Sequence, residues 1–404
     1  MSKKRAVIIT VIITFVCTTV LTTAVRFFND SGLLDIIGLT GKTEYSASSV
    51  EKAANIVSQF YYEDVDESVL YKGALEGMIS ALDDEYSWFV DEESFKELKE
   101  ETQGEYTGIG VTVSIDDADE TITVISPIED TPAFKAGIKP GDKIIAIDGT
   151  RVGLSNYRDA VNMLKGDSSM VGKNVVLTLK RAGTGSLEEV TLIREKIHLI
   201  TVKSKMLPEN VGYIRITSFG ENTYNEFETN FTSLGSESLK GLVIDLRNNG
   251  GGILTSTLGV ADTFLDEGLI TYFQYKNGSK TEYKSDADII DIPVVVLVNG
   301  QSASASEVLA AALHDRGRAT LVGEKTYGKG VVQTVLPFIK TDKGETAIYI
   351  TTSRYFTPAG VCIHGTGITP DVSVSLPEEY AKLGFDNLTL EQDNQLKIAW
   401  EMLK

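Results

Sequence analysis

The spacing of apolar residues changes along the chain and predicts different structure in each part. Between residues 46 and 101 apolar side chains recur at the interval of an α-helix. The first of these runs comprises Val50, Ala53, Ile56, Val57 and Phe60. Between residues 104 and 196, short apolar stretches alternate with polar residues and glycine turns, which predicts strands. After Val211, apolar strands alternate with helical stretches, a pattern typical of an α/β core.

These changes predict a multidomain α/β protein. We expect an N-terminal helical region at 45–103, a β-rich domain at 104–196, a core at 197–375 and a C-terminal helical region at 376–404. The N-terminal helices either pack on the next domain or form an arm that makes a homodimer. The pattern alone leaves both interpretations open.

The residues before this region predict an attachment to a membrane. Residues 6–25 carry no charge and are about long enough to cross a bilayer as one helix. Lys3, Lys4 and Arg5 precede them, so the N-terminus is expected to stay in the cytoplasm. We therefore expect a transmembrane signal-anchor at 1–27, a linker at 28–44, and a single-pass cell-membrane protein with its remaining domains extracytoplasmic. A cleaved signal peptide is the alternative, because residues 22–24 are small.

Composition excludes several classes of function. The formal net charge of −19 argues against a nucleic-acid partner, since phosphates would be repelled. The two cysteines and three histidines show no metal-ligand spacing, so neither a metal nor another cofactor is expected. The length of 404 residues is enough for two or three domains.

Residues 300–307 read GQSASASE and offer a candidate nucleophile, Ser304. Ser304 stands at the start of a predicted helix, where backbone amides and the helix dipole favour a developing negative charge. The spacing Ser304-x-x-Glu307 also matches a capping box, in which the serine only caps the helix. Ser302 and Ser306 alternate with Ser304, so residue chemistry alone does not choose among the three serines.

Lys329 is the candidate general base. It lies in a glycine-flanked turn, Thr326-Tyr327-Gly328-Lys329-Gly330, 25 residues after Ser304. A neutral lysine can accept the serine proton if apolar surroundings lower its pKa. The same turn is close to a phosphate-binding loop, but Gly330 replaces the serine or threonine that holds magnesium, and a strand pattern follows.

A glycine run after a buried strand is a candidate anion site. Residues 248–252 read NNGGG and follow the strand that ends at Arg247. Bare glycine amides can approach a ligand closely, although such a run is also typical of a flexible turn. Asp245 and Arg247 are expected to pair structurally rather than take part in the chemistry.

The β-rich domain resembles a PDZ domain over its whole length. The residues that carry this resemblance are Thr107-Gly108-Ile109-Gly110 and the run from Ala133 to Ile144, AFKAGIKPGDKI, followed by Asp148-Gly149. The resemblance implies that Thr107, Gly108, Ile109 and Gly110 form the loop that holds the C-terminal carboxylate of a peptide. The peptide then adds a strand to the edge of the sheet.

Together the motifs resemble the carboxyl-terminal processing peptidases, serine-lysine proteases with an embedded PDZ domain. Besides the segments above, Arg354 to Gly360 and Gly367 to Asp371 match closing motifs of that family. Leu82 to Ser87 resembles its N-terminal signature, although Asp84-Glu85 departs from the usual Asp-Pro. The resemblance implies a core of the crotonase and Clp protease fold and a serine endopeptidase that recognises accessible C-terminal tails.

The same resemblance assigns roles to individual residues. It implies Ser304 as nucleophile, Lys329 as base and Gln333 as the residue that orients Lys329. The amides of Ala305 and of Gly250 or Gly251 would form the oxyanion hole. Lys165 stands where the family often has an arginine, so gating of the active site by the PDZ domain could differ here if that position senses ligand. Asp315 would give structural support.

Two rival functions remain at this point. One is a catalytically silent PDZ adaptor that presents tails to another protease, and intact Ser304, Lys329 and Gln333 argue against it. The other is a serine hydrolase that uses His314 or His364. Consecutive side chains on a helix point apart, so His314 and Asp315 are not expected to form a relay. The physiological substrate does not follow from the sequence.

Overall fold

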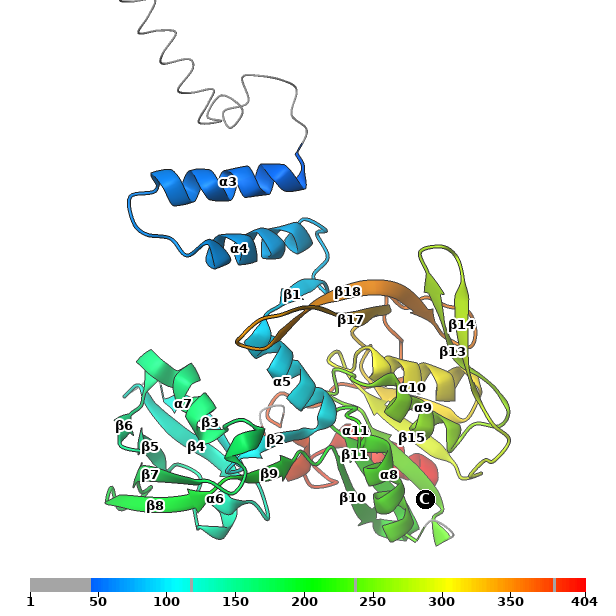
Figure 1. Ribbon diagram of the computed structural model, residues 1–404. Helices are drawn as coiled ribbons and strands as arrows, with labels where there is room; N and C mark the ends of the chain where they lie inside the picture. Colours follow the sequence, from blue (N-terminus) through cyan, green and yellow to red (C-terminus); the bar gives the residue numbers. More distant parts are fainter. Residues whose placement is uncertain (1–44, 117–118, 236–237, 381–382) are drawn as a thin grey trace, which may run out of the picture. The chain divides into compact units, whose positions relative to one another are not determined.

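The computed structural model describes residues 45–404, except for residues 117–118, 236–237 and 381–382 (Figure 1). These residues belong to two compact units, which divide between Phe89 and Val90. The predicted signal-anchor at 1–27 and the linker at 28–44 lie outside the described residues. Within the described part of the chain, no helix is long and apolar enough to span a bilayer.

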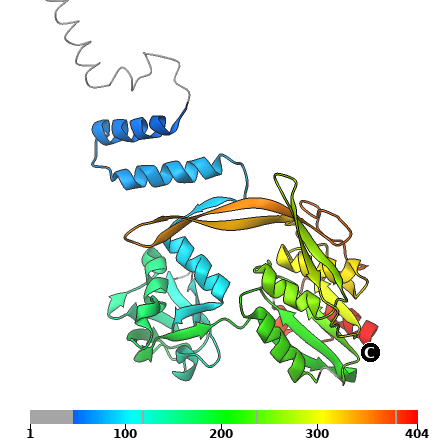
Figure 2. The ribbon, with the colours of Figure 1, turned by 45° about the vertical axis from the view of Figure 1, so that its right-hand side comes forward.

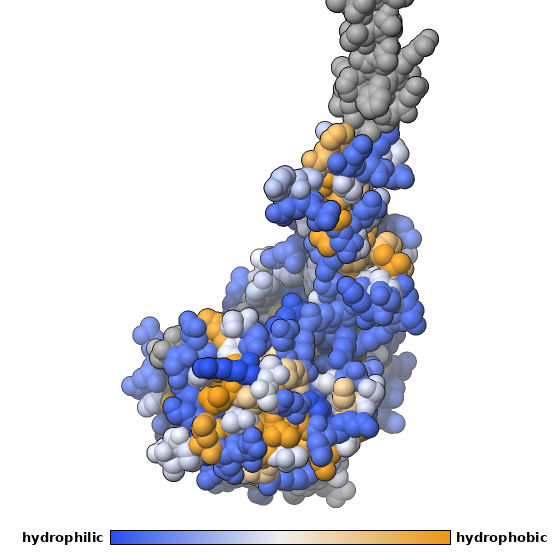
Figure 3. All heavy atoms as spheres, turned by 60° about the vertical axis from the view of Figure 1, so that its left-hand side comes forward, coloured by the Kyte–Doolittle hydropathy of each residue, from blue (hydrophilic) through white to orange (hydrophobic). Residues whose placement is uncertain are grey.

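The first unit contains two helices, α3 (Ala47–Phe60) and α4 (Glu67–Ser80). Asp66 begins α4 by accepting a hydrogen bond from the Ser68 amide at 2.9 Å. Ala54 is the single buried residue in these two helices. Figure 3 shows apolar side chains exposed on the pair. The large ones are Val50, Val57, Phe60, Val69, Tyr71 and Met78.

The helical prediction for residues 46–101 is wrong at one place. Residues Trp88–Val90 form a short strand, β1, at the boundary between the units. Helix α5 (Glu92–Gln103) then opens the second unit. Three extended residues between helices are too few for a periodic signal, which explains why the apolar pattern did not reveal them.

The PDZ-like domain contains a five-stranded antiparallel path in the order β3-β4-β5-β7-β8. The strands are β3 (Val111–Asp116), β4 (Thr121–Pro127), β5 (Lys143–Ile147), β7 (Asn174–Lys180) and β8 (Leu187–Ile193), and the short β6 (Thr150–Arg151) pairs with β5. Helices α6 (Pro132–Lys135) and α7 (Tyr157–Leu164) complete the domain. A separate ribbon joins β2 (Glu105–Gly108) to β9 (Glu195–His198). Strand β3 is therefore an edge of its sheet.

The α/β core is built on a six-stranded sheet in the order β10-β11-β12-β15-β16-β19. Five of its strands are parallel to one another: β11 (Val211–Ile216), β12 (Gly241–Asp245), β15 (Val294–Val298), β16 (Ala319–Gly323) and β19 (Val372–Ser373). The sixth, β10 (Val202–Leu207), is antiparallel to β11. One apolar cluster joins the sheet to three helices, α8 (Thr223–Ser233), α9 (Leu254–Asp262) and α10 (Ala305–Asp315). A second apolar cluster joins the sheet to α11 (Asn394–Leu403). Neighbouring residues of one strand divide between the clusters, Ile244 joining the first and Val243 the second. Helices therefore cover both faces of the sheet.

A second sheet carries Gln333 and Tyr355. Four of its strands pair antiparallel in the order β17 (Val331–Lys340), β18 (Glu345–Phe356), β13 (Gly268–Tyr275) and β14 (Lys280–Ser285). Figure 2 shows β17 and β18 as one long twisted ribbon, with α5 beside it. Phe95 of α5 is buried with Ala347 of β18.

The C-terminal region at 376–404 is helical only in part. Helix α11 and a short 3-10 turn, Phe385–Asn387, are its helical elements within the described residues. Helix α11 is tied to the sheet by the fully buried Arg247. Its guanidinium donates to Asp393, the N-cap of α11, to Gln395 within the helix, and to Asp245 of β12. The expected structural pairing of Asp245 with Arg247 is thus confirmed, at 2.6 Å from Nη2 to Oδ2.

Candidate active site

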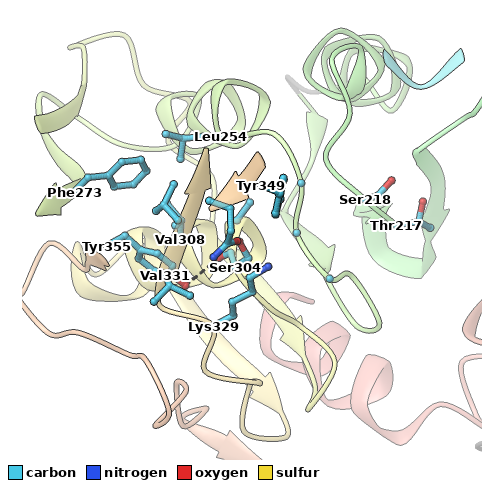
Figure 4. Close-up of a pocket in the computed structure, with 16 residues that line it drawn as sticks. Thr217, Ser218, Leu254, Phe273, Ser304, Val308, Lys329, Val331, Tyr349 and Tyr355 are labelled. Atoms are coloured by element: carbon cyan, nitrogen blue, oxygen red, sulfur yellow. Dashed lines mark hydrogen bonds between the residues drawn. The ribbon is translucent and has the colours of Figure 1, made fainter. Parts of the chain in front are cut away.

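A cavity of about 460 Å³ lies beside the start of helix α10. Ser304, Lys329 and Gln333 line it together, although they come from a helix start, a loop and strand β17. The predicted oxyanion-hole residues Ala305, Gly250 and Gly251 line it as well. Figure 4 shows Ser304 and Lys329 at this cavity, with Leu254, Phe273 and Val308 among the apolar side chains around it. The fold therefore gathers six residues that lie up to 83 positions apart, from Gly250 to Gln333.

The structure distinguishes the three serines. Ser302 and Ser306 are completely buried, and their hydroxyls donate to the carbonyls of Leu246 at 2.8 Å and Asn249 at 2.9 Å. Ser304 is half-buried and faces the cavity. Its φ of 54° and ψ of −117° are unusual for a residue with a Cβ, a strain that is concentrated at functional sites. Ser304 is the serine that a substrate can reach.

Glu307 connects Ser304 to the turn that contains Lys329. Its carboxylate is buried, and Oε2 accepts the backbone amides of Ser304 and Lys329, both at 2.9 Å. Oε1 accepts the Gly328 amide at 2.8 Å and the Thr326 hydroxyl at 2.5 Å. Burial raises the pKa of Glu307, and the four donors oppose that shift. One carboxylate thus holds the Ser304 and Lys329 segments together.

The capping-box interpretation accounts for only a small part of these contacts. Glu307 does accept the Ser304 amide, as a capping box requires. The Glu307 amide, however, already donates to the Ser304 carbonyl at 2.9 Å. The buried Tyr355 hydroxyl donates to the same carbonyl at 3.1 Å, shown as a dashed line in Figure 4. Burial raises the pKa of Tyr355 well above its ordinary value, and the charge of Glu307 adds to this, so the hydroxyl stays a donor.

Lys329 lies in the loop between β16 and β17 and is half-buried. Val308, Val331 and Tyr355 line the same cavity as Lys329. Gln333 follows on β17, where its Nε2 donates to Thr351 Oγ1 at 3.1 Å. The role of Gln333 in orienting Lys329 stays a prediction.

The glycine turn approaches Ser304 very closely. Gly251 has a φ of 102°, and a Cβ there would lie 2.8 Å from the Ala303 carbonyl oxygen and 2.9 Å from Ser304 Cβ. Its amide already donates to Asn249 Oδ1 at 2.9 Å. The amides of Gly250 and Ala305, in contrast, have no acceptor among the described residues. Both amides belong to residues that line the cavity, and they are available to an anion.

No histidine is among the described residues that line this cavity. Neither His314 nor His364 is among the residues that line it. The expectation that His314 and Asp315 point apart is wrong, because His314 Nδ1 lies 3.4 Å from Asp315 Oδ1, and its Nε2 lies 3.1 Å from Asp371. The other Asp315 oxygen accepts the Ala359 amide at 3.0 Å, which ties helix α10 to a later loop.

The PDZ-like domain has its own small pocket, of about 50 Å³. Ile109, Gly110 and Lys165 line it with the β3 residues Val111 and Val113. The amides of Ile109 and Gly110 have no acceptor within the described residues. Thr107 and Gly108 belong instead to strand β2 and do not line the pocket. Only half of the predicted loop therefore faces this pocket.

Lys165 also contacts a residue outside the pocket, because its Nζ lies 3.3 Å from Glu100 Oε2 of helix α5. Within the pocket, the same Nζ lies 5.5 Å from the centre of the Tyr106 ring. The same helix reaches α7 a second time, because Glu93 accepts from Arg158 at 3.1 Å and from Asn162 at 3.0 Å. Helix α5 is thus bound to the PDZ helix that flanks the pocket.

Comparison with known proteins agrees with this geometry. Residues 210–374 match the model of peptidase family S41, residues 107–192 match a PDZ domain, and residues 32–94 match the model described as activating protease CtpB N-terminal domain. The carboxy-terminal processing protease CtpA of Bacillus subtilis is 37% identical over 411 residues, covering 100% of this chain and 85% of that protein. A carboxyl-terminal-processing protease of Synechocystis is 34% identical, over 82% of this chain and 76% of its own.

The fold is found in solved structures too. A photosystem II D1 C-terminal processing protease matches with a TM-score of 0.50 at 29% identity, covering 86% of this chain and 97% of its own. An S41 protease from Bacteroides fragilis has the same fold, with a TM-score of 0.54 at 16% identity.

Proposed function

The chain belongs to the carboxy-terminal processing serine proteases of peptidase family S41, and we propose that it cleaves peptide bonds with Ser304 and Lys329. Ser304 Oγ attacks the peptide carbonyl carbon while the neutral Lys329 amine takes the hydroxyl proton. The carbonyl oxygen becomes an oxyanion, and the Gly250 and Ala305 amides donate to it. As the carbon–nitrogen bond breaks, Lys329 returns the proton to the leaving amine, and water then hydrolyses the acyl-enzyme.

One observation carries this proposal: a half-buried serine, a half-buried lysine and two unpaired backbone amides line the same cavity. Gly250 is preferred to Gly251 because the Gly251 amide already has an acceptor in Asn249. Gln333 lines the same cavity four residues after Lys329 and is proposed to orient its amine.

We propose further that the PDZ domain selects substrates by their C-terminal tails. The free amides of Ile109 and Gly110 can hold a terminal carboxylate, and the unpaired edge of β3 can accept an added strand. Lys165, in the same pocket, is already near Glu100, so a tail carboxylate would compete with that glutamate for it. The tail would thereby loosen helix α5 from the PDZ domain, which is the proposed gating step.

The location and assembly of the protease are also proposals. Residues 6–25 would anchor the chain so that the protease domains are extracytoplasmic. A homodimer through α3 and α4 would cover side chains such as Val69 and Met78, which are 63% and 60% exposed. Sedimentation of the full chain would test the dimer, since Val69→Glu should shift it to monomer, and a parent that is already monomeric at micromolar concentration would contradict the proposal.

The decisive experiment on the chemistry compares the full chain with Ser304→Ala and Lys329→Ala. The substrate is an unfolded protein with an apolar C-terminal tail, and the folding of each variant is checked by circular dichroism. Both variants should lose cleavage while His314→Ala and His364→Ala retain it. Cleavage that survives Lys329→Ala would contradict the serine-lysine mechanism. Tail binding without any Ser304-dependent cleavage would favour the silent adaptor instead.

A further inference from the structure

A second cavity, of about 270 Å³, adjoins the catalytic one. The two cavities share Gly251 and Gly252 of the glycine turn, Gln333 of β17 and Tyr349 of β18, and also Ser218. A peptide that passes Ser304 along the glycine turn therefore reaches the second cavity directly. The far wall of this cavity is formed by helix α5, through Leu98 and Thr102.

The lining of the second cavity is mainly apolar. Five apolar or aromatic side chains contribute to it, and none of its lining residues is charged. They are Leu98, Phe219, Ile253, Val335 and Tyr349. Phe219 is only 2% exposed, whereas the other four are partly exposed and present open apolar surface. The Thr102 hydroxyl donates to the Leu98 carbonyl at 2.6 Å, so this polar group is already satisfied. Covering this apolar surface with an apolar side chain of a bound peptide removes it from water and so stabilises the complex.

Backbone hydrogen bonds hold this wall at a fixed place relative to the nucleophile. The Glu221 amide donates to the Thr102 carbonyl at 3.1 Å, which ties α5 to the segment after β11. In that segment, the Phe219 amide donates to the Gly251 carbonyl at 2.9 Å, and the Ile253 amide donates to the Phe219 carbonyl at 2.6 Å. The cavity is therefore built onto the same glycine turn that approaches Ser304.

We propose that the second cavity is an apolar subsite of the protease, with Leu98 as its specificity-determining residue. The inference rests on the proposed function, because it assumes that a peptide lies beside Ser304. Alternate side chains of an extended peptide point to the same side, so adjoining pockets take residues two positions apart. Favoured substrates should place one aliphatic or aromatic residue in this subsite. A second aliphatic or aromatic residue, two positions away in the peptide, should lie in the catalytic cavity.

The test uses the full chain and a series of peptides with one constant C-terminal tail. Cleavage sites are mapped by mass spectrometry with the parent enzyme, and each residue within four positions of the cleaved bond is then changed between Leu and Ala. We expect kcat/KM to fall about tenfold or more for Ala at two positions, spaced by two. Leu98→Trp, which fills the cavity, should reverse the preference at only one of them.

Two further variants make the result specific. Val335→Phe narrows the same cavity from strand β17 and should act like Leu98→Trp, so a folding defect in one variant does not decide the outcome. Glu97→Ala changes an exposed neighbour on α5 that does not line the cavity and should keep the parent preference. Thermal melts establish that each variant is folded.

The outcomes separate the subsite from the function. Ser304-dependent cleavage whose preferences are unchanged by both cavity variants would overturn the subsite and leave the protease intact. A single apolar position, instead of two spaced by two, would overturn it as well. Absence of Ser304-dependent cleavage by the parent would overturn the proposed function and the subsite with it.

Discussion

Replacing Glu307 by glutamine tests whether one buried carboxylate holds the nucleophile and the base together. The carboxylate accepts four hydrogen bonds, two at each oxygen, and a glutamine amide can accept at one end only. The less costly orientation places the amide nitrogen at the Oε1 position. There the Thr326 hydroxyl can accept a hydrogen bond, but the Gly328 amide loses its acceptor.

A buried donor that loses its acceptor costs about 1–3 kcal/mol. At about 1.4 kcal/mol per tenfold, this corresponds to a factor of about 5 to 150. A shift of the Gly328 turn is the simplest way for the Gly328 amide to find another acceptor, and this shift carries Lys329 away from Ser304. We therefore expect Glu307→Gln to lower kcat by a factor in this range and to leave KM nearly unchanged, because Glu307 does not line the substrate cavity.

The assay is steady-state hydrolysis of one peptide by the full chain, together with urea unfolding of each variant. Glu324→Gln is the matched control, since Glu324 lies in the same loop with its side chain exposed. Parent-like kcat and parent-like stability in Glu307→Gln would refute the reasoning. A rise in KM at constant kcat would also refute it, since that result would place Glu307 in substrate binding.

Three other predictions follow from the site and its surroundings. Gly251→Ala should lower kcat for peptide hydrolysis at least tenfold, because the added Cβ would lie 2.8 Å from the Ala303 carbonyl oxygen. Gly250→Ala is the comparison: nothing lies within 4 Å of its Cβ, so this variant should keep its backbone amide and most of the activity. Arg247→Met should cost about 3–5 kcal/mol in urea unfolding, because it leaves two buried carboxylates without their cation, and a loss below about 1 kcal/mol would contradict this. Burial raises the pKa of Glu307 in the folded protein. Its contribution to the free energy of unfolding is therefore full below the ordinary glutamate pKa and is lost as the pH rises through the raised pKa. Unfolding measured across this pH range should show the decrease in the parent and not in Glu307→Gln.

Local patterns were sufficient to predict most elements. Strands β4 and β7 lie in the stretch between residues 104 and 196 where alternation predicted strands, and β12 is one of the apolar strands expected after Val211. Such strands bury one or both faces, so their side chains reveal the periodicity directly. Strand β1 has three residues and left no period to detect.

Contacts between distant segments could not be derived in this way. The spacing of Ser304 and Glu307 indicated a helix cap, and a cap is a local device. The other partners of Glu307 lie 19 to 22 residues later in a loop. The parallel pairing of β15 with β16 and a hydrogen bond from the Tyr327 amide to the Ser302 carbonyl bring that loop to the helix start. Tyr355 reaches the Ser304 carbonyl from strand β18, 51 residues away. For the three serines, too, only burial could show which one a substrate can reach.

The neutralisation of Arg247 by Asp393 sets an order of events during synthesis. Every residue assigned to the chemistry has been made by position 333, but Asp393 is added 60 residues later. At about 5–20 residues per second, this interval lasts about 3–12 s. Until Asp393 is made, Asp245 is the one carboxylate of this network that Arg247 can reach. The ion-pair network beside the glycine turn is therefore completed by the C-terminal segment, after every residue assigned to the chemistry has been made.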